Sequence, residues 1–179
     1  MSVFLKIIYY TVAVSCLLVA AGTFLMPAFR HPEPQKRNLS LSQMRQIVMG
    51  MVLYAGEDGD SHHFPYNPRG YEYAMYKLLE YDYFPDSVFT SPLSRQGSCV
   101  NKERKCIENC SYVYLNRKSM KFKEKEALCV IAEKRYRDEI EGGNLAFLDG
   151  SARFVRDPDY RPEKYLGKTY EEIFGESPD

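Results

Sequence analysis

The 179-residue chain carries 24 basic and 24 acidic side chains, so its formal net charge is zero. A balanced total gives no sign of a nucleic-acid-binding protein or of strong attraction to anionic lipid, and we expect no nucleic-acid partner. The residues beyond His31 suffice for one folded domain with its own core but hardly for two. We therefore expect the residues after the amino-terminal segment to form a single folded domain, which we call the head.

An uncharged stretch runs from Ile7 to Phe29. A helix rises about 1.5 Å per residue, so this stretch can cross a hydrocarbon core of about 30 Å, and residues 1–30 are expected to form a membrane anchor. A cleaved signal peptide is the alternative, because Lys6 supplies a basic start and Val19-Ala20-Ala21 a small-residue cleavage site. Cys16 is interpreted as a lipid-facing or helix-packing residue.

The segment after the anchor contains His31-Pro32-Glu33-Pro34, and its prolines predict a stiff linker over residues 31–39. Ser40 then begins the pattern of a capping box, with Gln43 three residues later. Apolar residues recur behind it at helical spacing: Leu41, Met44, Val48, Met51 and Ala55. The pattern predicts an amphipathic helix that covers a sheet, within a globular domain of residues 40–179.

The carboxy-terminal part of the chain encodes a β-hairpin in local rules. Asn144–Leu148 is a short strand of good β-formers, and the alternating residues up to Val155 form its partner. Asp149-Gly150 between them predicts a two-residue turn. Asp149 is expected to accept a local backbone hydrogen bond, and Gly150 to take the left-handed conformation.

Further elements are predicted from composition and from the residues that break helices and strands. A short helix is expected from Gly70 to about Tyr81, and two more strands at Ser111–Leu115 and Ala127–Ala132. Thr169–Phe174 is expected to form one helical turn, in which Glu172 completes a capping box. The prediction is an α+β fold with about four antiparallel strands.

Two motifs resemble a known family in the same order along the chain. Gly142–Phe154 contains a Gly-rich, aromatic strand that leads into Asp149-Gly150. Upstream, Met44–Met49 leads through Leu53-Tyr54-Ala55 and an acidic loop to Phe64-Pro65. Both resemble the pseudopilins of type II secretion, in the group with a carboxy-terminal His-x9-Asp-Gly signature. Glu139 stands where that signature has its histidine.

The resemblance implies a pilin-like fold and a non-enzymatic role in assembly or substrate recognition of a type II secretion or pilus-like system. Its partners would be other pseudopilin-like subunits or exported proteins. In keeping with this, the chain shows no nucleophile, metal or cofactor motif of an enzyme. The alternative is a secreted, soluble ligand-binding module, released by signal-peptide cleavage, that uses the Tyr-rich loops between Tyr66 and Tyr83.

Two signals disagree about orientation. Arg30, Lys36 and Arg37 follow the uncharged stretch, which favours a cytoplasmic body. Four cysteines favour export, because an even set in an exported domain predicts two disulfides with three possible pairings: Cys99, Cys106, Cys110 and Cys129. A zinc site is the alternative use of these thiols. The resemblance favours export, so we expect a single-pass protein of the bacterial inner membrane whose head faces the periplasm.

Two acidic pairs are weak candidates for calcium. Asp58 and Asp60 lie in the acidic loop beside two histidines, although a solvated turn explains the same composition. Asp157 and Asp159 flank Pro158 near the carboxy terminus, where the resemblance suggests calcium. We expect no other cofactor.

Overall fold

The computed structural model describes residues 33–57, 63–94, 96–118, 120, 127–134 and 141–175. From Lys36 onward these residues belong to one compact unit. The expected membrane anchor, residues 1–30, lies outside them. Among the described helices, none is both long enough and apolar enough to cross a membrane.

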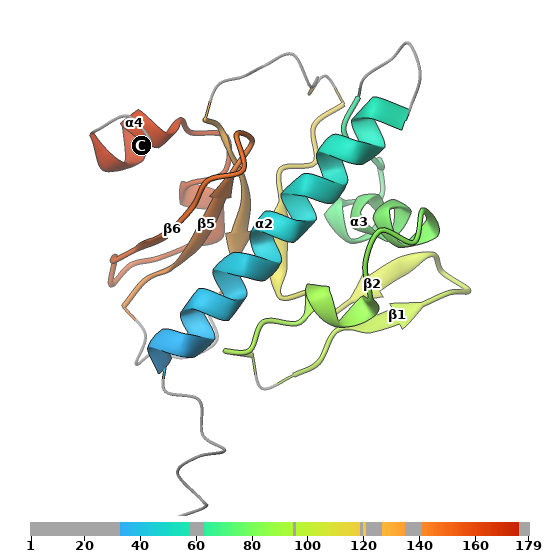
Figure 1. Ribbon diagram of the computed structural model, residues 1–179, viewed down its shortest axis with the longest axis horizontal. Coiled ribbons are helices and arrows are strands. Elements are labelled where there is room, and N and C mark those ends of the chain that lie inside the picture. The colour runs from blue at the N-terminus through green and yellow to red at the C-terminus, as the bar shows by residue number, and fades with distance from the viewer. Residues whose placement is uncertain are drawn as a thin grey trace, which may run out of the picture. The chain divides into compact units, whose positions relative to one another are not determined.

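The longest element is the helix α2 (Glu33–Glu57), shown in blue to cyan in Figure 1. Residues 33–39 are helical, so for them the prediction of a linker over residues 31–39 is wrong, and so is the prediction of a cap at Ser40; residues 31 and 32 lie outside the described part of the chain. Pro34 is compatible with this because a proline in the first helical turn removes no intrahelical hydrogen bond. Ser40 is instead completely buried inside the helix and donates its hydroxyl hydrogen to Glu133.

The main sheet has four antiparallel strands, as predicted. They are β3 (Tyr112–Tyr114), β4 (Cys129–Glu133), β5 (Gly143–Phe147) and β6 (Ala152–Val155), and each pairs with the next along the chain. An irregularity in β4 follows Cys129. The strands form a meander, which needs only local connections.

Both faces of the sheet are covered. On one face lies the main core, to which α2 contributes residues at helical spacing: Met44, Ile47, Val48, Met51, Tyr54 and Ala55. On the other face the carboxy-terminal segment contributes three aromatic side chains, Tyr160, Tyr165 and Tyr170. Burial of these apolar surfaces is the main force holding the layers together.

Smaller elements complete the described unit. The predicted short helix is α3 (Tyr71–Glu80), and the 3₁₀ turn η3 (Asp86–Phe89) follows it. A further hairpin, β1 (Cys99–Asn101) with β2 (Cys106–Glu108), was not predicted, because each strand is only three residues long and ends in a polar residue.

The carboxy terminus ends as the sequence predicts. After the 3₁₀ turn η4 (Pro162–Lys164), the short helix α4 (Tyr170–Phe174) begins with a complete capping box. The Thr169 side chain accepts a hydrogen bond from Glu172 N, and Thr169 N donates to the Glu172 carboxylate at 2.7 Å. Both partners satisfy helix-terminal donors, which makes this signature readable from sequence.

The turn between β5 and β6 differs from the prediction by one residue. Phe147 N donates to Ser151 O at 2.9 Å, so Leu148, Asp149 and Gly150 form a three-residue loop. Gly150 has a φ of 87°, as expected for the left-handed residue of such loops. Asp149 accepts hydrogen bonds from the backbone and hydroxyl of Ser151, which confirms its turn role.

Replacement of Gly150 by Val tests this turn. A Cβ at this position meets nothing within 4 Å, so the effect comes only from forcing a β-branched residue to positive φ. We expect a loss of about 1–3 kcal/mol in the free energy of unfolding, measured by denaturant titration. Gly97→Val is the control, because Gly97 also has open space around it but no positive φ. Equal effects of the two substitutions would contradict the assigned backbone conformation.

Candidate functional site

The outward face of α2 exposes large apolar side chains. Leu39, Met49 and Leu53 have 51%, 60% and 49% of their surface exposed. Between Asn38 and Gly56 the helix has a single charged residue, Arg45. A helix face in contact with water is normally rich in charge, so this face has the composition of a contact surface.

A groove of about 380 Å³ lies beside this face. Its lining comes from two successive turns of α2 and from the segment after α3: Gln46, Met49, Gly50, Leu53, Tyr83, Phe84 and Pro85. The Phe84 ring packs directly on Gly50, where a Cβ atom would lie 2.3 Å from the ring. A glycine inside a helix lowers its stability, so here it serves the close approach of Phe84.

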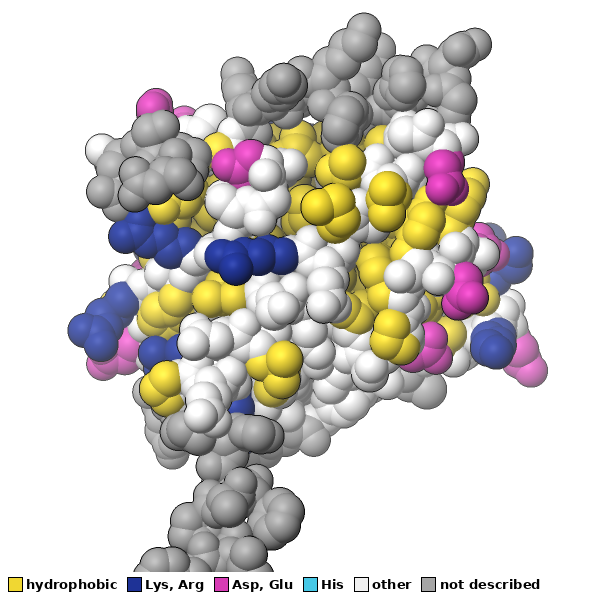
Figure 2. Space-filling model, in the orientation of Figure 1, with side chains coloured by type: hydrophobic (Ala, Val, Ile, Leu, Met, Phe, Trp, Pro, Cys, Tyr) yellow, Lys and Arg dark blue, Asp and Glu magenta, His cyan; other side chains and the backbone are white. Residues whose placement is uncertain are grey.

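Aromatic contacts hold the wall of the groove in place. Tyr81 stacks on Tyr83 with 5.6 Å between ring centroids, and it meets the Tyr54 ring of α2 edge-on at 5.2 Å. The Tyr83 hydroxyl donates to the Glu57 carboxylate at 2.6 Å. Figure 2 views this side of the molecule and shows hydrophobic side chains at the surface along α2 and around its carboxy-terminal half.

A buried carboxyl group lies between α2 and the sheet. Glu133 at the end of β4 is 2% exposed and accepts a hydrogen bond from the Ser40 hydroxyl at 2.7 Å. The Ser91 hydroxyl donates to the same oxygen, and Asn144 of β5 adds hydrogen bonds from its backbone and side chain. The Tyr160 hydroxyl donates to Glu133 O at 2.8 Å. The donors from Ser40, Ser91 and Asn144 replace the water that the carboxyl group loses on burial.

Burial and hydrogen bonding have opposite effects on this group. Burial raises the pKa of Glu133 above its ordinary value, while the hydrogen bonds from Ser91, Ser40 and Asn144 lower it by less. The group is enclosed by its protein partners, so it acts in this structure as a junction between elements. Sequence reasoning did not find this cluster, because its members lie far apart along the chain.

Three of the four cysteines considered for disulfides are free in this structure. Cys106, Cys110 and Cys129 are all buried and unbridged, and the side chain of Cys99 is not among those described. Each of the two predicted disulfides would need at least one of these three thiols, so neither is formed in this structure. Cys110 packs in the α2 core with its sulfur 3.8 Å from that of Met75, whereas Cys129 belongs to the cluster on the opposite face.

Burial also governs the chemistry of two of these thiols. It raises the pKa of both Cys110 and Cys129 to about 12, so both stay protonated at neutral pH. A protonated, enclosed thiol is a poor nucleophile and a poor metal ligand. Within the described part of the chain, no group of three or more His, Cys, Asp or Glu side chains could hold a metal ion.

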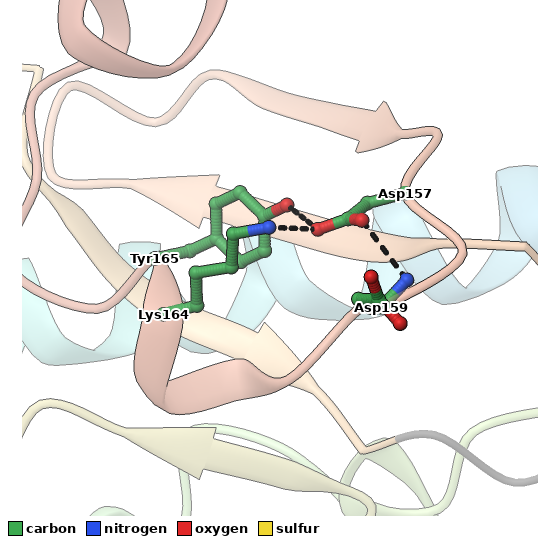
Figure 3. Close-up of polar contacts among 4 residues, drawn as sticks. All are labelled: Asp157, Asp159, Lys164 and Tyr165. Carbon is green, nitrogen blue, oxygen red and sulfur yellow. Dashed lines mark hydrogen bonds and ion pairs between the residues drawn. The ribbon is translucent and has the colours of Figure 1, made fainter.

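The structure describes one of the two candidate calcium pairs. Asp58 and Asp60 lie outside the described residues. Asp157 uses both carboxylate oxygens within the chain: Oδ1 accepts from Asp159 N at 3.0 Å, and Oδ2 accepts from Lys164 Nζ at 2.5 Å and from the Tyr165 hydroxyl (Figure 3). These hydrogen bonds, that from Lys164 first, lower the pKa of Asp157 to about 2. Asp157 thus fastens η4 to the end of β6.

The fold and these sites were compared with known proteins. No family model, curated protein or solved structure matches the chain. The candidate site is the outward face of α2 with its groove, and its role is therefore inferred from its geometry alone.

Glu133→Gln tests the buried carboxyl. The folded-state pKa of Glu133 is raised, so its favourable contribution is complete at low pH and is lost as the pH rises through that pKa. We expect the free energy of unfolding of the wild type to fall, relative to the Gln variant, as the pH rises from mildly acidic to neutral. The measurement is denaturant unfolding across that pH range. Glu163→Gln, at an exposed position in η4, is the control and should run parallel to the wild type.

Asp157→Asn tests the contact in Figure 3. The pKa of Asp157 is lowered, so the stability it contributes is present at neutral pH and is lost as the pH falls through about 2. We expect the variant to melt at a lower temperature than the wild type at pH 7, with the gap closing in strong acid. Asp159→Asn is the matched control, because only the backbone of Asp159 takes part. If calcium raised the melting temperature of the wild type but not that of the Asp157→Asn variant, the result would instead support a metal role for Asp157.

Proposed function

We propose that this chain is a non-enzymatic, pseudopilin-like envelope protein that is anchored in the bacterial inner membrane by its amino-terminal segment. Its head faces the periplasm and acts in assembly or substrate recognition of a type II secretion or pilus-like system. One observation carries the proposal: α2 has an apolar face toward its own sheet and a second apolar face toward solvent, with Met49 60% exposed. Such a helix is suited to contact another protein.

The order of elements supports the resemblance on which the proposal draws. A long helix comes first, its inner face packs on a four-stranded antiparallel sheet, and the sheet ends in the β5–β6 hairpin that carries Asp149 and Gly150. The hairpin holds the Gly-rich motif that resembles the family signature. The uncharged stretch Ile7–Phe29 supports the anchor, because its length suits a hydrocarbon core.

A secreted, soluble ligand-binding module is the second candidate. The observation that favours it is the groove beside α2, where Tyr83 and Phe84 form an aromatic wall. Aromatic side chains with polar groups nearby are typical of ligand sites. This function would require release of the head by signal peptidase.

The amino terminus decides between the two. We expect intact-mass spectrometry of protein from washed native membranes to show a chain that retains residues 1–30. Protease added to spheroplasts should digest the head, because the head faces the periplasm. A chain that begins near Gly22 and is found in the soluble periplasmic fraction would favour the secreted module. A head protected from protease until the membrane is opened would overturn the proposed orientation.

A further inference from the structure

The outward face of α2 has a regular pattern. Six of its exposed positions follow one another at alternating spacings of three and four residues: Leu39, Ser42, Gln46, Met49, Leu53 and Gly56. We call these six residues the outer stripe. This is the heptad spacing by which two helices pack along a common seam, and the stripe extends over about 26 Å of helix.

The stripe is composed of large and small residues in complementary places. Large apolar side chains lie at Leu39, Met49 and Leu53, whereas Ser42 and Gly56 are small. If a second α2 runs antiparallel, Leu39 lies opposite the partner's Gly56 and Leu53 lies opposite the partner's Ser42. Packing of large against small residues fills space along a seam, whereas large residues directly opposite one another would hold the helices apart.

The charges at the two ends of α2 favour the same direction, while the exposed Arg45 near the middle is turned to its own β6, where it donates to Ala152 O at 3.2 Å. Lys36 lies one turn before the stripe and Glu57 directly follows it, and both occupy the flank of the seam. An antiparallel pair brings each Lys36 near the partner's Glu57, at both ends. A parallel pair would instead leave each Lys36 and the partner's Glu57 at opposite ends of the seam, too far apart for this contact. Flanking charges of this kind select the orientation of helix pairs.

The groove supplies the space that a partner helix needs. Gln46, Met49 and Leu53 belong both to the stripe and to the groove lining, so a helix seated on the stripe also enters the groove. Near the centre of an antiparallel pair, Gln46 lies opposite the partner's Met49. The thioether of Met adapts to irregular surfaces, which suits this position.

We propose that two copies of this chain associate through their outer stripes, with the two α2 helices antiparallel. The pairing rests on the proposed function in one respect, namely that α2 uses its outward face for protein contact, and it names the partner as a second copy. The contact is symmetric, because each stripe faces the other, so it closes as a dimer.

Cysteine crosslinking of the full chain in detergent micelles tests the direction. The double variant L39C/G56C should form a disulfide-linked dimer on mild oxidation, because the two introduced thiols lie opposite each other in an antiparallel pair. The single variants L39C and G56C should remain at the level of the wild type, which also controls for the five native cysteines. Efficient crosslinking of L39C alone would show parallel helices and overturn the proposal. No crosslinking of the double variant would also overturn it.

A charge exchange tests the partner contacts independently. Lys36→Glu or Glu57→Lys should weaken the dimer about tenfold in sedimentation equilibrium, because each change affects two symmetric contacts. The double variant K36E/E57K should restore wild-type association. The matched exchange K102E/E103K, in the β1–β2 turn, should leave association unchanged. Circular dichroism checks that E57K stays folded, because Glu57 also accepts the Tyr83 hydrogen bond.

Failure of the pairing and failure of the proposed function give different results. A monomer that retains residues 1–30 and fractionates with membranes would overturn the pairing and leave the anchored function in place. A dimer that begins near Gly22 would keep the pairing and remove the anchor. Single charge variants that associate as tightly as the wild type would also count against the antiparallel arrangement.

Discussion

The hydrogen bonds to the Glu133 carboxyl group are the constraint on which the arrangement of the head depends. They join α2 through Ser40, the segment after η3 through Ser91, and β5 through Asn144. A carboxyl group that is removed from water must keep such partners, since an unpaired one destabilises the fold strongly. Ser40 must therefore face the sheet, and this sets the rotation of α2 about its own axis.

The rotation of α2 determines what the protein presents to its surroundings. With Ser40 turned inward, Met44, Ile47 and Met51 enter the core, and Leu39 and Met49 turn outward. The buried cluster and the exposed stripe are thus two consequences of one orientation.

The parts of the fold that were predicted correctly follow local rules. The α4 capping box needs only Thr169 and Glu172, and the β5–β6 turn needs only a residue such as Gly150 that readily adopts positive φ. The start of α2 could not be found in this way, because Ser40 looks like a helix cap until its partner 93 residues away is known. The cysteines illustrate the same limit: their even number suggested disulfides, whereas the fold places Cys110 and Cys129 on opposite faces of the sheet.

The outer stripe is also visible in the sequence, as large apolar residues beyond those that the sheet-facing side of α2 needs. A helix that covers a sheet needs one apolar side, and the residues from Met44 to Ala55 provide it. Leu39, Met49 and Leu53 are then in excess, and between Asn38 and Gly56 only Arg45 is charged. Its own sheet covers the inner side of α2, whereas these three side chains remain exposed on the opposite side. This exposed excess is the observation from which a second apolar neighbour is proposed.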